Sequence, residues 1–393
     1  MTTNLRHAAG SLLVVGLGGA ELTGLERAWL RLVRPAGIIL FRRNIADAKQ
    51  TRALLEDAAA LCTAHSLRCV DVEGGTVDRL RDALAPMPSA QAVARKALEP
   101  TLSHGTRKDG APGPHGLMRQ HGELIARGVS AFGFNTTLAP VLDLALPASA
   151  QVMGTRSAAP TPEGAIEYAR NFLAGLSAQG VAGCAKHFPG LGGGALDSHA
   201  ETPAIRRGFD DLWREDLVPY RALRDELPMV MVNHAAYPNT PGGMRPATAS
   251  HFWITTVLRK RVGYRGIVFS DDMEMGGILK FLPMEDAAIE AIRAGMDLLE
   301  ICHSPELILR AYEALIGEAE RSAAFRNLLL KRAQETASKR AKLFAGPAPK
   351  ALSARQFEAL RDRILRFREQ FDETPTTSAS ATVARAATKA ETA

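Results

Sequence analysis

Eight short apolar runs along the first three quarters of the chain constrain its fold more than any other feature. They begin at Ser11, Gly37, Leu67, Ala131, Val181, Pro228, Gly266 and Met296. Longer stretches separate them, and some of these have helical spacing, such as 47–61 and 284–294. Continuous apolar runs are typical of parallel strands covered on both faces. The pattern predicts an α/β fold, a (β/α)8 TIM-type barrel.

Polar side chains follow directly after several of these runs. Asp71 ends the third run, Lys186 and His187 end the fifth, and Asp271 ends the seventh. In a closed parallel barrel these strand ends meet at one rim, where barrel enzymes place their active sites. Loops that follow strands are commonly polar as well, so the pattern favours an enzyme without deciding it.

Composition excludes several other classes of protein. With 46% hydrophobic and 23% charged residues, the chain is neither a disulfide scaffold nor largely disordered. Its four cysteines form no CxxC pair, which argues against a zinc ribbon and fits a reducing compartment. The net charge of +6 carries no nucleic-acid signature, and no segment is long enough to span a bilayer. We therefore expect a cytoplasmic protein without a nucleic-acid partner.

The pattern changes towards the C-terminus. We expect a barrel domain over 1–345, an amphipathic helix within 346–372 and a disordered tail over 373–393. The helix repeats apolar residues at three- and four-residue spacing, at Phe357, Leu360, Ile364, Phe367 and Phe371. Docking against the barrel is the simplest interpretation, although its basic outer face leaves a membrane-surface or partner helix open. The Gly/Pro-rich segment 99–116 resembles an inserted surface loop.

The densest polar segment is AKHFPGLGGGALDSHAETP, from Ala185 to Pro203. Its glycines predict a mobile loop between Phe188 and Asp197. Asp197 lies two residues before His199, which is close enough for the carboxylate to orient the imidazole. Such a histidine can act as a general acid and base near neutral pH. The alternative is a turn capped by the aspartate, with a solvated histidine.

Two adjacent carboxylates, Asp271 and Asp272, end the seventh run. Neighbouring residues of a strand point to opposite sides, so only one of them can easily face a given pocket. The simplest assignment is one nucleophile and one supporting group. A metal site that includes His187, His199 or His234 is an alternative, although no HxH or HExxH pair strengthens it.

Three further charged residues follow the barrel runs or lie in the loops between them. Asp71, Arg79 and Arg156 are suited to binding sugar hydroxyls through charge-assisted hydrogen bonds. The same groups would serve equally well in structural salt bridges.

Together, these motifs resemble a known family. VDVEGGTVDRL, APVLDL, MGTRS, AKHFPG, DSHAETP, FSDDMEM and AIRAGMDLLEICH occur in this order over about residues 10 to 305. The set is similar to that of bacterial β-N-acetylglucosaminidases of glycoside hydrolase family 3, of the single-barrel cytoplasmic type that acts in peptidoglycan recycling.

The resemblance implies a retaining, double-displacement mechanism without a metal or cofactor. It implies that Asp271 is the nucleophile and that His199 is the general acid/base, with Asp197 as its partner. The residues that it implies for binding the N-acetylglucosamine unit are Asp71, Arg79, Arg156, Lys186 and His187. This sequence departs from the usual pattern at Leu191 and Thr76, where the family has histidine and arginine.

The expected activity is removal of a terminal N-acetylglucosamine from muropeptides or chito-oligosaccharides. A phosphorylase with the same residues is an alternative, because a histidine acid/base would not repel a phosphate acceptor. A non-catalytic sugar-binding protein and a metal-dependent barrel hydrolase also stay open, as does the oligomeric state.

Overall fold

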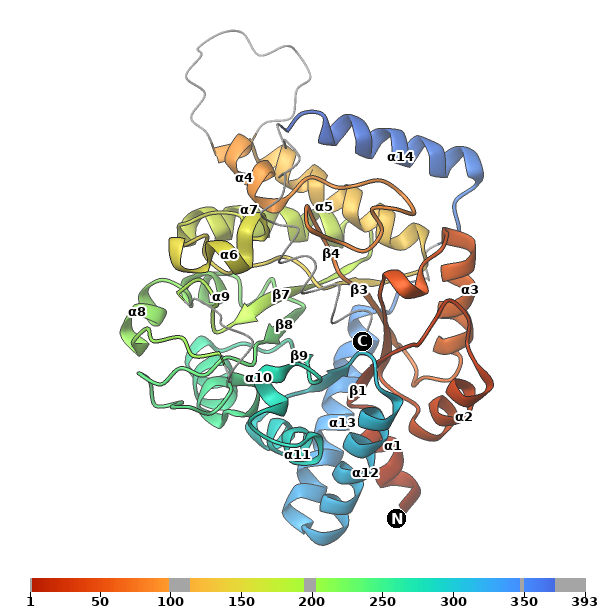
Figure 1. Cartoon of the computed structure of the whole chain (residues 1–393), viewed down its shortest axis with the longest axis vertical. Helices are drawn as coiled ribbons and strands as arrows, with labels where there is room; N and C mark the ends of the chain where they lie inside the picture. The colour runs from red at the N-terminus through yellow and green to blue at the C-terminus, as the bar shows by residue number, and fades with distance from the viewer. Residues whose placement is uncertain (1, 99–113, 194–202, 347–349, 372–393) are drawn as a thin grey trace.

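Eight parallel strands close into a barrel in the computed structural model, which describes residues 2–98, 114–193, 203–346 and 350–371 (Figure 1). The order around the barrel is that of the sequence, and the last strand pairs with the first. The barrel strands are β1 Leu13–Gly16, β2 Gly37–Leu40, β3 Leu67–Val70, β6 Thr136–Thr137, β7 Ala182–Phe188, β8 Met229–Val232, β9 Ile267–Asp272 and β10 Leu298–Ile301. Each predicted run overlaps one of these strands, so the predicted (β/α)8 barrel is confirmed.

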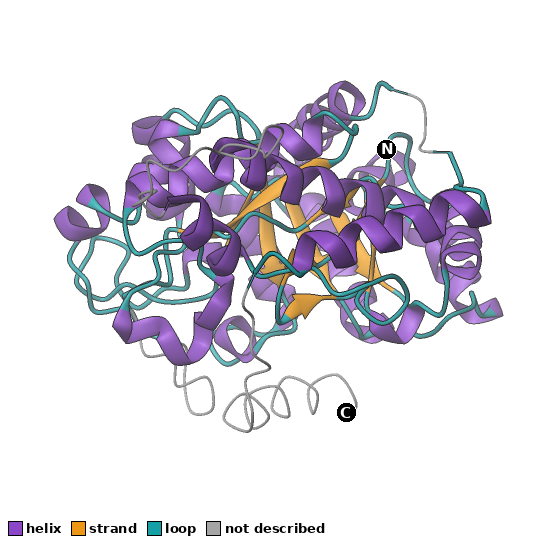
Figure 2. Ribbon diagram, turned by 90° about the horizontal axis from the view of Figure 1, so that it is seen from above, coloured by secondary structure: helices purple, strands orange, loops and turns teal. Residues whose placement is uncertain are grey.

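Helices surround the strands, as Figure 2 shows. They are α1 Thr2–Gly10, α2 Gly24–Val33, α3 Ala48–Ala59, α4 Ala90–Leu98, α5 Pro114–Ala131, α6 Ala150–Met153, α7 Pro162–Ser177, α8 Phe209–Arg214, α9 Val218–Ala222, the π-helix η5 Phe252–Val262, α10 Gly276–Leu279, α11 Met284–Ala294, α12 Pro305–Arg321, α13 Ala323–Leu343 and α14 Ala354–Arg368. The helices predicted over 47–61 and 284–294 are α3 and α11. None of the described helices is both long and apolar enough to cross a lipid bilayer.

The fourth predicted run, from Ala131 to Leu144, contains much less strand than expected. The helix α5 continues to Ala131, and β6 covers only Thr136 and Thr137. Gly133 has a φ of 92°, so the chain turns there before it reaches the barrel. Pro140 has no N–H to donate to a neighbouring strand, so β6 ends before it and only isolated contacts with β7, such as the Val141–Lys186 bridge, follow.

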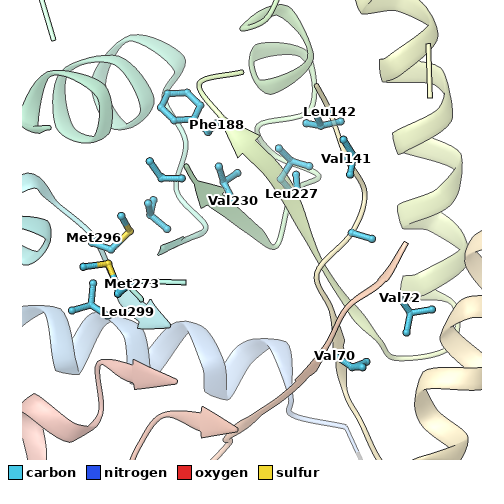
Figure 3. Packing of buried hydrophobic residues seen from close by; sticks show 14 of the residues in the cluster. Val70, Val72, Val141, Leu142, Phe188, Leu227, Val230, Met273, Met296 and Leu299 are labelled. Carbon is cyan, nitrogen blue, oxygen red and sulfur yellow. The ribbon is translucent and has the colours of Figure 1, made fainter. Parts of the chain in front are cut away.

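Apolar side chains alternate between two sides of the barrel wall. One cluster includes Val14, Cys69 and Phe269, whereas their strand neighbours Val15 and Val70 belong to the cluster under the helices. Figure 3 shows part of this outer cluster. Since the wall is packed on both faces, the strand ends are held rigidly.

The C-terminal helix α14 packs on the barrel helix α5. Leu360, Ile364 and Phe367 are buried, and the Phe367 ring stacks on His121 of α5 with centroids 6.0 Å apart. The amphipathic pattern therefore serves docking, as the simplest interpretation predicted. The division into domains stays a prediction; residues 99–113 and the tail lie outside the described residues.

Candidate active site

A chain of alternating charges crosses the rim at the carboxyl ends of β3 and β7. Lys186 Nζ lies 2.8 Å from Asp71 Oδ1 and 2.6 Å from Glu73 Oε1. Glu73 also accepts two hydrogen bonds of 2.8 Å from the guanidinium of Arg156. Arg156 Nη2 in turn lies 3.3 Å from His187 Nε2. Four of the sequence-predicted binding residues thus converge at one place.

Burial makes this network strongly coupled. The side chains of Glu73 and Lys186 are 2% and 4% exposed, so each ion would be costly without its partner. Burial alone would raise the pKa of Glu73, but Arg156 and Lys186 outweigh it and hold the pKa well below its usual range. Burial would lower the pKa of Lys186, but Asp71 and Glu73 raise it. These directions favour the charged forms of Glu73, Arg156 and Lys186.

Asp143 fixes the orientation of His187. Its Oδ2 lies 2.6 Å from His187 Nδ1 and accepts the backbone N–H of the same residue at 3.1 Å. A carboxylate can only accept, so Nδ1 carries the proton and Nε2 is left to accept from Arg156. The other oxygen of Asp143 accepts the N–H of Leu191 at 2.7 Å.

Arg79 is placed differently from the other predicted binding residues. Its backbone N–H donates to the carbonyl of Asp71 at 3.1 Å, while its guanidinium lies 5.8 Å from the centre of the Phe41 ring. The side chain is half-buried. The backbone of Arg79 therefore lies beside Asp71 at the end of β3, and its side chain lies near the Phe41 ring.

The adjacent carboxylates of β9 have different surroundings. The Asp272 carboxylate lies 3.7 Å from His303 Nδ1, which also lies 3.0 Å from Glu274. Asp272 and Glu274 raise the pKa of His303 to about 9. Asp271 Oδ1 instead accepts the backbone N–H of Asp272 at 2.9 Å. Asp272 thus lies beside a histidine, whereas Asp271 contacts the backbone.

Two buried side chains hold the backbone around these carboxylates. His234 Nε2 donates to the Asp272 carbonyl at 2.9 Å, and its Nδ1 lies 2.8 Å from Thr248 Oγ1. Burial lowers the pKa of His234 although Asp271 is nearby, which favours the neutral ring. His234 is therefore a support for β9.

The structure describes only the first part of the predicted mobile loop. Asp197 and His199 lie outside the described residues. Leu191 is buried, and the hydroxyl of Tyr237 donates to the Gly190 carbonyl at 2.8 Å. A side chain at Gly190 would collide with Asp216. Residues 189–192 are thus buried, with hydrogen bonds to Gly190 and Leu191, and the mobility predicted between Phe188 and Asp197 stays a prediction.

Sequence reasoning assigned no role to Glu73 and Asp143. Glu73 stands two residues after Asp71, and Asp143 lies within APVLDL, so both were inside recognised motifs. Their partners are distant in sequence: Arg156 is 83 residues from Glu73. Both residues are carboxylates that follow an apolar run, and this pattern could have indicated a role for them.

One group of potential metal ligands occurs within the described parts of the chain. It consists of Asp272, Cys302 and His303, whose ligand atoms lie within 4.8 Å of one another. The metal alternative weighed from the sequence combined the β9 carboxylates with other histidines. Among the described residues, neither His187 nor His234 joins such a group.

Glu300 of β10 lies buried among the carboxylates of the site. Its Oε1 has no hydrogen-bond partner among the described residues. Burial, together with Asp71, Asp272 and Asp271, raises the pKa of Glu300 well above its usual value. This direction favours the protonated, neutral side chain in the folded protein.

A stability prediction follows for Glu300→Gln. In the wild type, the unfolded chain releases the Glu300 proton above its ordinary pKa while the folded chain keeps it. Stability therefore falls as pH rises, by up to about 1.4 kcal/mol per pH unit. The variant should lack this loss, so thermal unfolding should show a gain in melting temperature that is larger at pH 8 than at pH 5. A variant that is less stable at both pH values would contradict a neutral Glu300.

A closed parallel barrel with charged side chains from several strands at its carboxyl-end rim is typical of barrel enzymes. Residues 5–329 match the family described as the glycosyl hydrolase family 3 N-terminal domain. The chain belongs to glycosyl hydrolase family 3 and is a glycoside hydrolase, as the motifs predicted.

Similar proteins agree with this assignment. A β-hexosaminidase of Stenotrophomonas maltophilia is 34% identical over 320 residues, which cover 81% of this chain and 91% of that protein. A family 3 β-N-acetylglucosaminidase from Paenibacillus has a TM-score of 0.77 at 29% identity, covering 92% of this chain and 68% of that one. NagZ from Neisseria gonorrhoeae, solved with N-trifluoroacetyl-D-glucosamine, has a TM-score of 0.71 at 28% identity, covering 91% and 98%.

Proposed function

We propose that the protein is a retaining exo-β-N-acetylglucosaminidase that removes terminal N-acetylglucosamine from muropeptides or short chito-oligosaccharides. The observation that carries this proposal is the buried charge network of Asp71, Lys186, Glu73, Arg156 and His187 at the rim that also holds Asp271. Fixed donors and acceptors of this kind suit the hydroxyl groups of a sugar. The named relatives support the choice of sugar.

In the proposed first step, Asp271 attacks the anomeric carbon and His199 donates a proton to the departing oxygen. The bond to the leaving group breaks as the bond to the carboxylate forms, which gives a covalent glycosyl-enzyme. In the second step His199 removes a proton from water, and the resulting hydroxide equivalent attacks the same carbon and releases Asp271. Asp197 orients His199 in both steps.

Lys186 and Asp71 are proposed to bind ring hydroxyls of the sugar. Asp71 Oδ1 accepts from Lys186, and the side chain is 16% exposed, which leaves it partly accessible to a ligand. Arg156 and His187 hold their positions through Glu73 and Asp143. The protein needs no metal or cofactor for this chemistry. We place the reaction in the cytoplasm and in peptidoglycan recycling.

The role of His199 predicts a dependence on the leaving group. His199→Ala should slow hydrolysis of substrates with poor leaving groups by about 10²–10⁴-fold, because their oxygen must be protonated as it departs. Activated aryl N-acetylglucosaminides should be affected much less. The measurement is kcat/KM for both substrate classes. Equal losses for the two classes would contradict an acid role for His199.

Product analysis distinguishes hydrolysis from phosphorolysis. The hydrolase should release free N-acetylglucosamine at a rate that does not depend on inorganic phosphate. Formation of the sugar 1-phosphate only when phosphate is present would identify a phosphorylase. Binding of N-acetylglucosamine without any turnover would identify a sugar-binding protein. Loss of turnover when a chelator is added would instead support a metal-dependent hydrolase.

A further inference from the structure

A cavity of about 650 Å³ opens at the amino ends of the barrel strands, opposite the rim that carries the active site. It lies between α13 and the segment that joins η5 to β9; Figure 1 shows α13 in light blue below the barrel. Its volume is within the range of small-molecule sites. The cationic lining residues are Arg259, Arg265, Lys331, Arg332, Lys339 and Lys342.

Three of these cations converge on one buried carboxylate. Asp297 accepts from Arg259 Nη2 at 2.6 Å, from Lys339 Nζ at 2.8 Å and from Arg332 Nη1 at 3.4 Å. It also accepts the backbone N–H of Val268. A single negative charge offsets only one of the three cations, so the cluster carries excess positive charge.

Glu335, the acid among the described lining residues, does not remove this excess. Glu335 lies 3.4 Å from Arg332 and 3.9 Å from Lys331. Arg265 and Lys342 are exposed, and within the described ranges neither forms an ion pair. The lining therefore holds six cations, and Glu335 together with Asp297 behind it supplies two carboxylates, which leaves an excess of four positive charges.

Lys339 lies partly buried among these charges. Burial, together with Arg259 and Arg332, lowers the pKa of Lys339 although Asp297 lies 2.8 Å from its ammonium group. A lysine beside a buried carboxylate ordinarily shows the opposite direction. The positive electrostatic potential of the cavity therefore follows from the charges of its lining residues, and the pKa shift, which burial causes first, is only consistent with it.

The opposite side of α13 provides no compensating acid. A second cavity of about 680 Å³ shares Gln334 with the first and has no Asp or Glu among the described residues of its lining. It contains Arg340, which is buried and donates from Nη1 to backbone carbonyls and to the hydroxyl of Thr63. Burial lowers the pKa of Arg340 to about 10. Both sides of the helix are therefore electropositive.

We propose that the cavity beside Asp297 is a second binding site, which takes a small anion carrying two or more phosphate groups. Arginine forks and lysine ammonium groups at close spacing are the groups that bind phosphate oxygens. The excess of four charges matches a diphosphate or triphosphate better than a monoanion. A structural ion cluster around Asp297 alone would not require Arg265, Lys331 or Lys342.

Isothermal titration of the full chain with inorganic pyrophosphate tests this proposal. We expect saturable binding at about 0.1 M salt that weakens as salt is raised. Arg265→Gln combined with Lys342→Gln should weaken binding at least about tenfold, because two cations that face no carboxylate are lost. The fold should be unaffected, since both residues are exposed. Orthophosphate should bind the wild type at least about tenfold more weakly than pyrophosphate.

A matched control separates this site from the general charge of the protein. Arg355→Gln combined with Arg366→Gln removes the same charge from exposed positions of α14 and should leave pyrophosphate affinity unchanged. Equal weakening in both double variants, equal affinity for the two phosphates or no binding by the wild type at millimolar pyrophosphate would overturn the proposal. Binding to phosphatidylserine vesicles without binding to pyrophosphate would also overturn it, in favour of a lipid surface.

Discussion

Asp271→Asn is expected to reduce turnover of an aryl N-acetylglucosaminide at least about 10³-fold while the protein remains folded. The amide is a poor nucleophile, so the covalent intermediate cannot form. The fold should survive because the oxygen of the asparagine can still accept the Asp272 N–H, which Asp271 Oδ1 accepts at 2.9 Å. The measurement is kcat with thermal unfolding of the same preparation.

Asp272→Asn is the matched control for this prediction. The Asp272 carboxylate lies 3.7 Å from His303 and supports the rim rather than the proposed reaction. Its loss should therefore reduce turnover far less than the loss of Asp271. Near-normal turnover by Asp271→Asn, or equal losses in the two variants, would contradict the assignment of Asp271 as the nucleophile.

The second large effect is expected for Glu73→Gln, which should destabilise the fold by about 3–5 kcal/mol. Glu73 is buried between Arg156 and Lys186, so the substitution leaves a buried Lys186 and a half-buried Arg156 without the carboxylate that they share. Asp71 and Asp143 lie near them but do not replace it. At about 2–4 °C per kcal/mol, the melting temperature should fall by roughly 10 °C. Sugar binding should weaken as well, since Lys186 and Arg156 lose their shared anchor.

Glu226→Gln provides the control for burial. Glu226 pairs with Arg170 at 3.0 Å, but both side chains are exposed, and such pairs contribute only about 0–1 kcal/mol. Its melting temperature should therefore stay close to that of the wild type. A Glu73→Gln variant as stable as Glu226→Gln would show that the charge network is not a structural element of the site.

The barrel was predictable because each of its strands has a local signal in the sequence. A run such as GIILF is apolar on both faces, and a covered parallel strand accommodates it. The same reasoning overestimated the run from Ala131 to Leu144, where a helix end, Gly133 and Pro140 share one apolar stretch. Apolar content alone does not distinguish a buried strand from a buried helix end.

The site was predictable only in part because its contacts join distant parts of the chain. Asp71 and Lys186 both follow apolar runs, so their presence at one rim followed from the barrel, but their 2.8 Å contact spans 115 residues. Sugar binding and salt bridges therefore both stayed open from sequence. The structure shows the salt bridges. Glu73 pairs with Arg156 and Lys186, and Asp143 pairs with His187. In the sequence, only their place in a motif distinguishes these two carboxylates from others.

The central claim is that Asp271 forms a covalent bond to the sugar, and mass spectrometry tests it most directly. The enzyme is exposed briefly to a fluorinated N-acetylglucosaminide, digested and analysed for a peptide that carries the sugar. We predict an adduct on the peptide that contains Asp271, and no adduct in the Asp271→Asn variant. An adduct on another residue, or rapid turnover with no adduct at any time, would contradict a covalent role for Asp271.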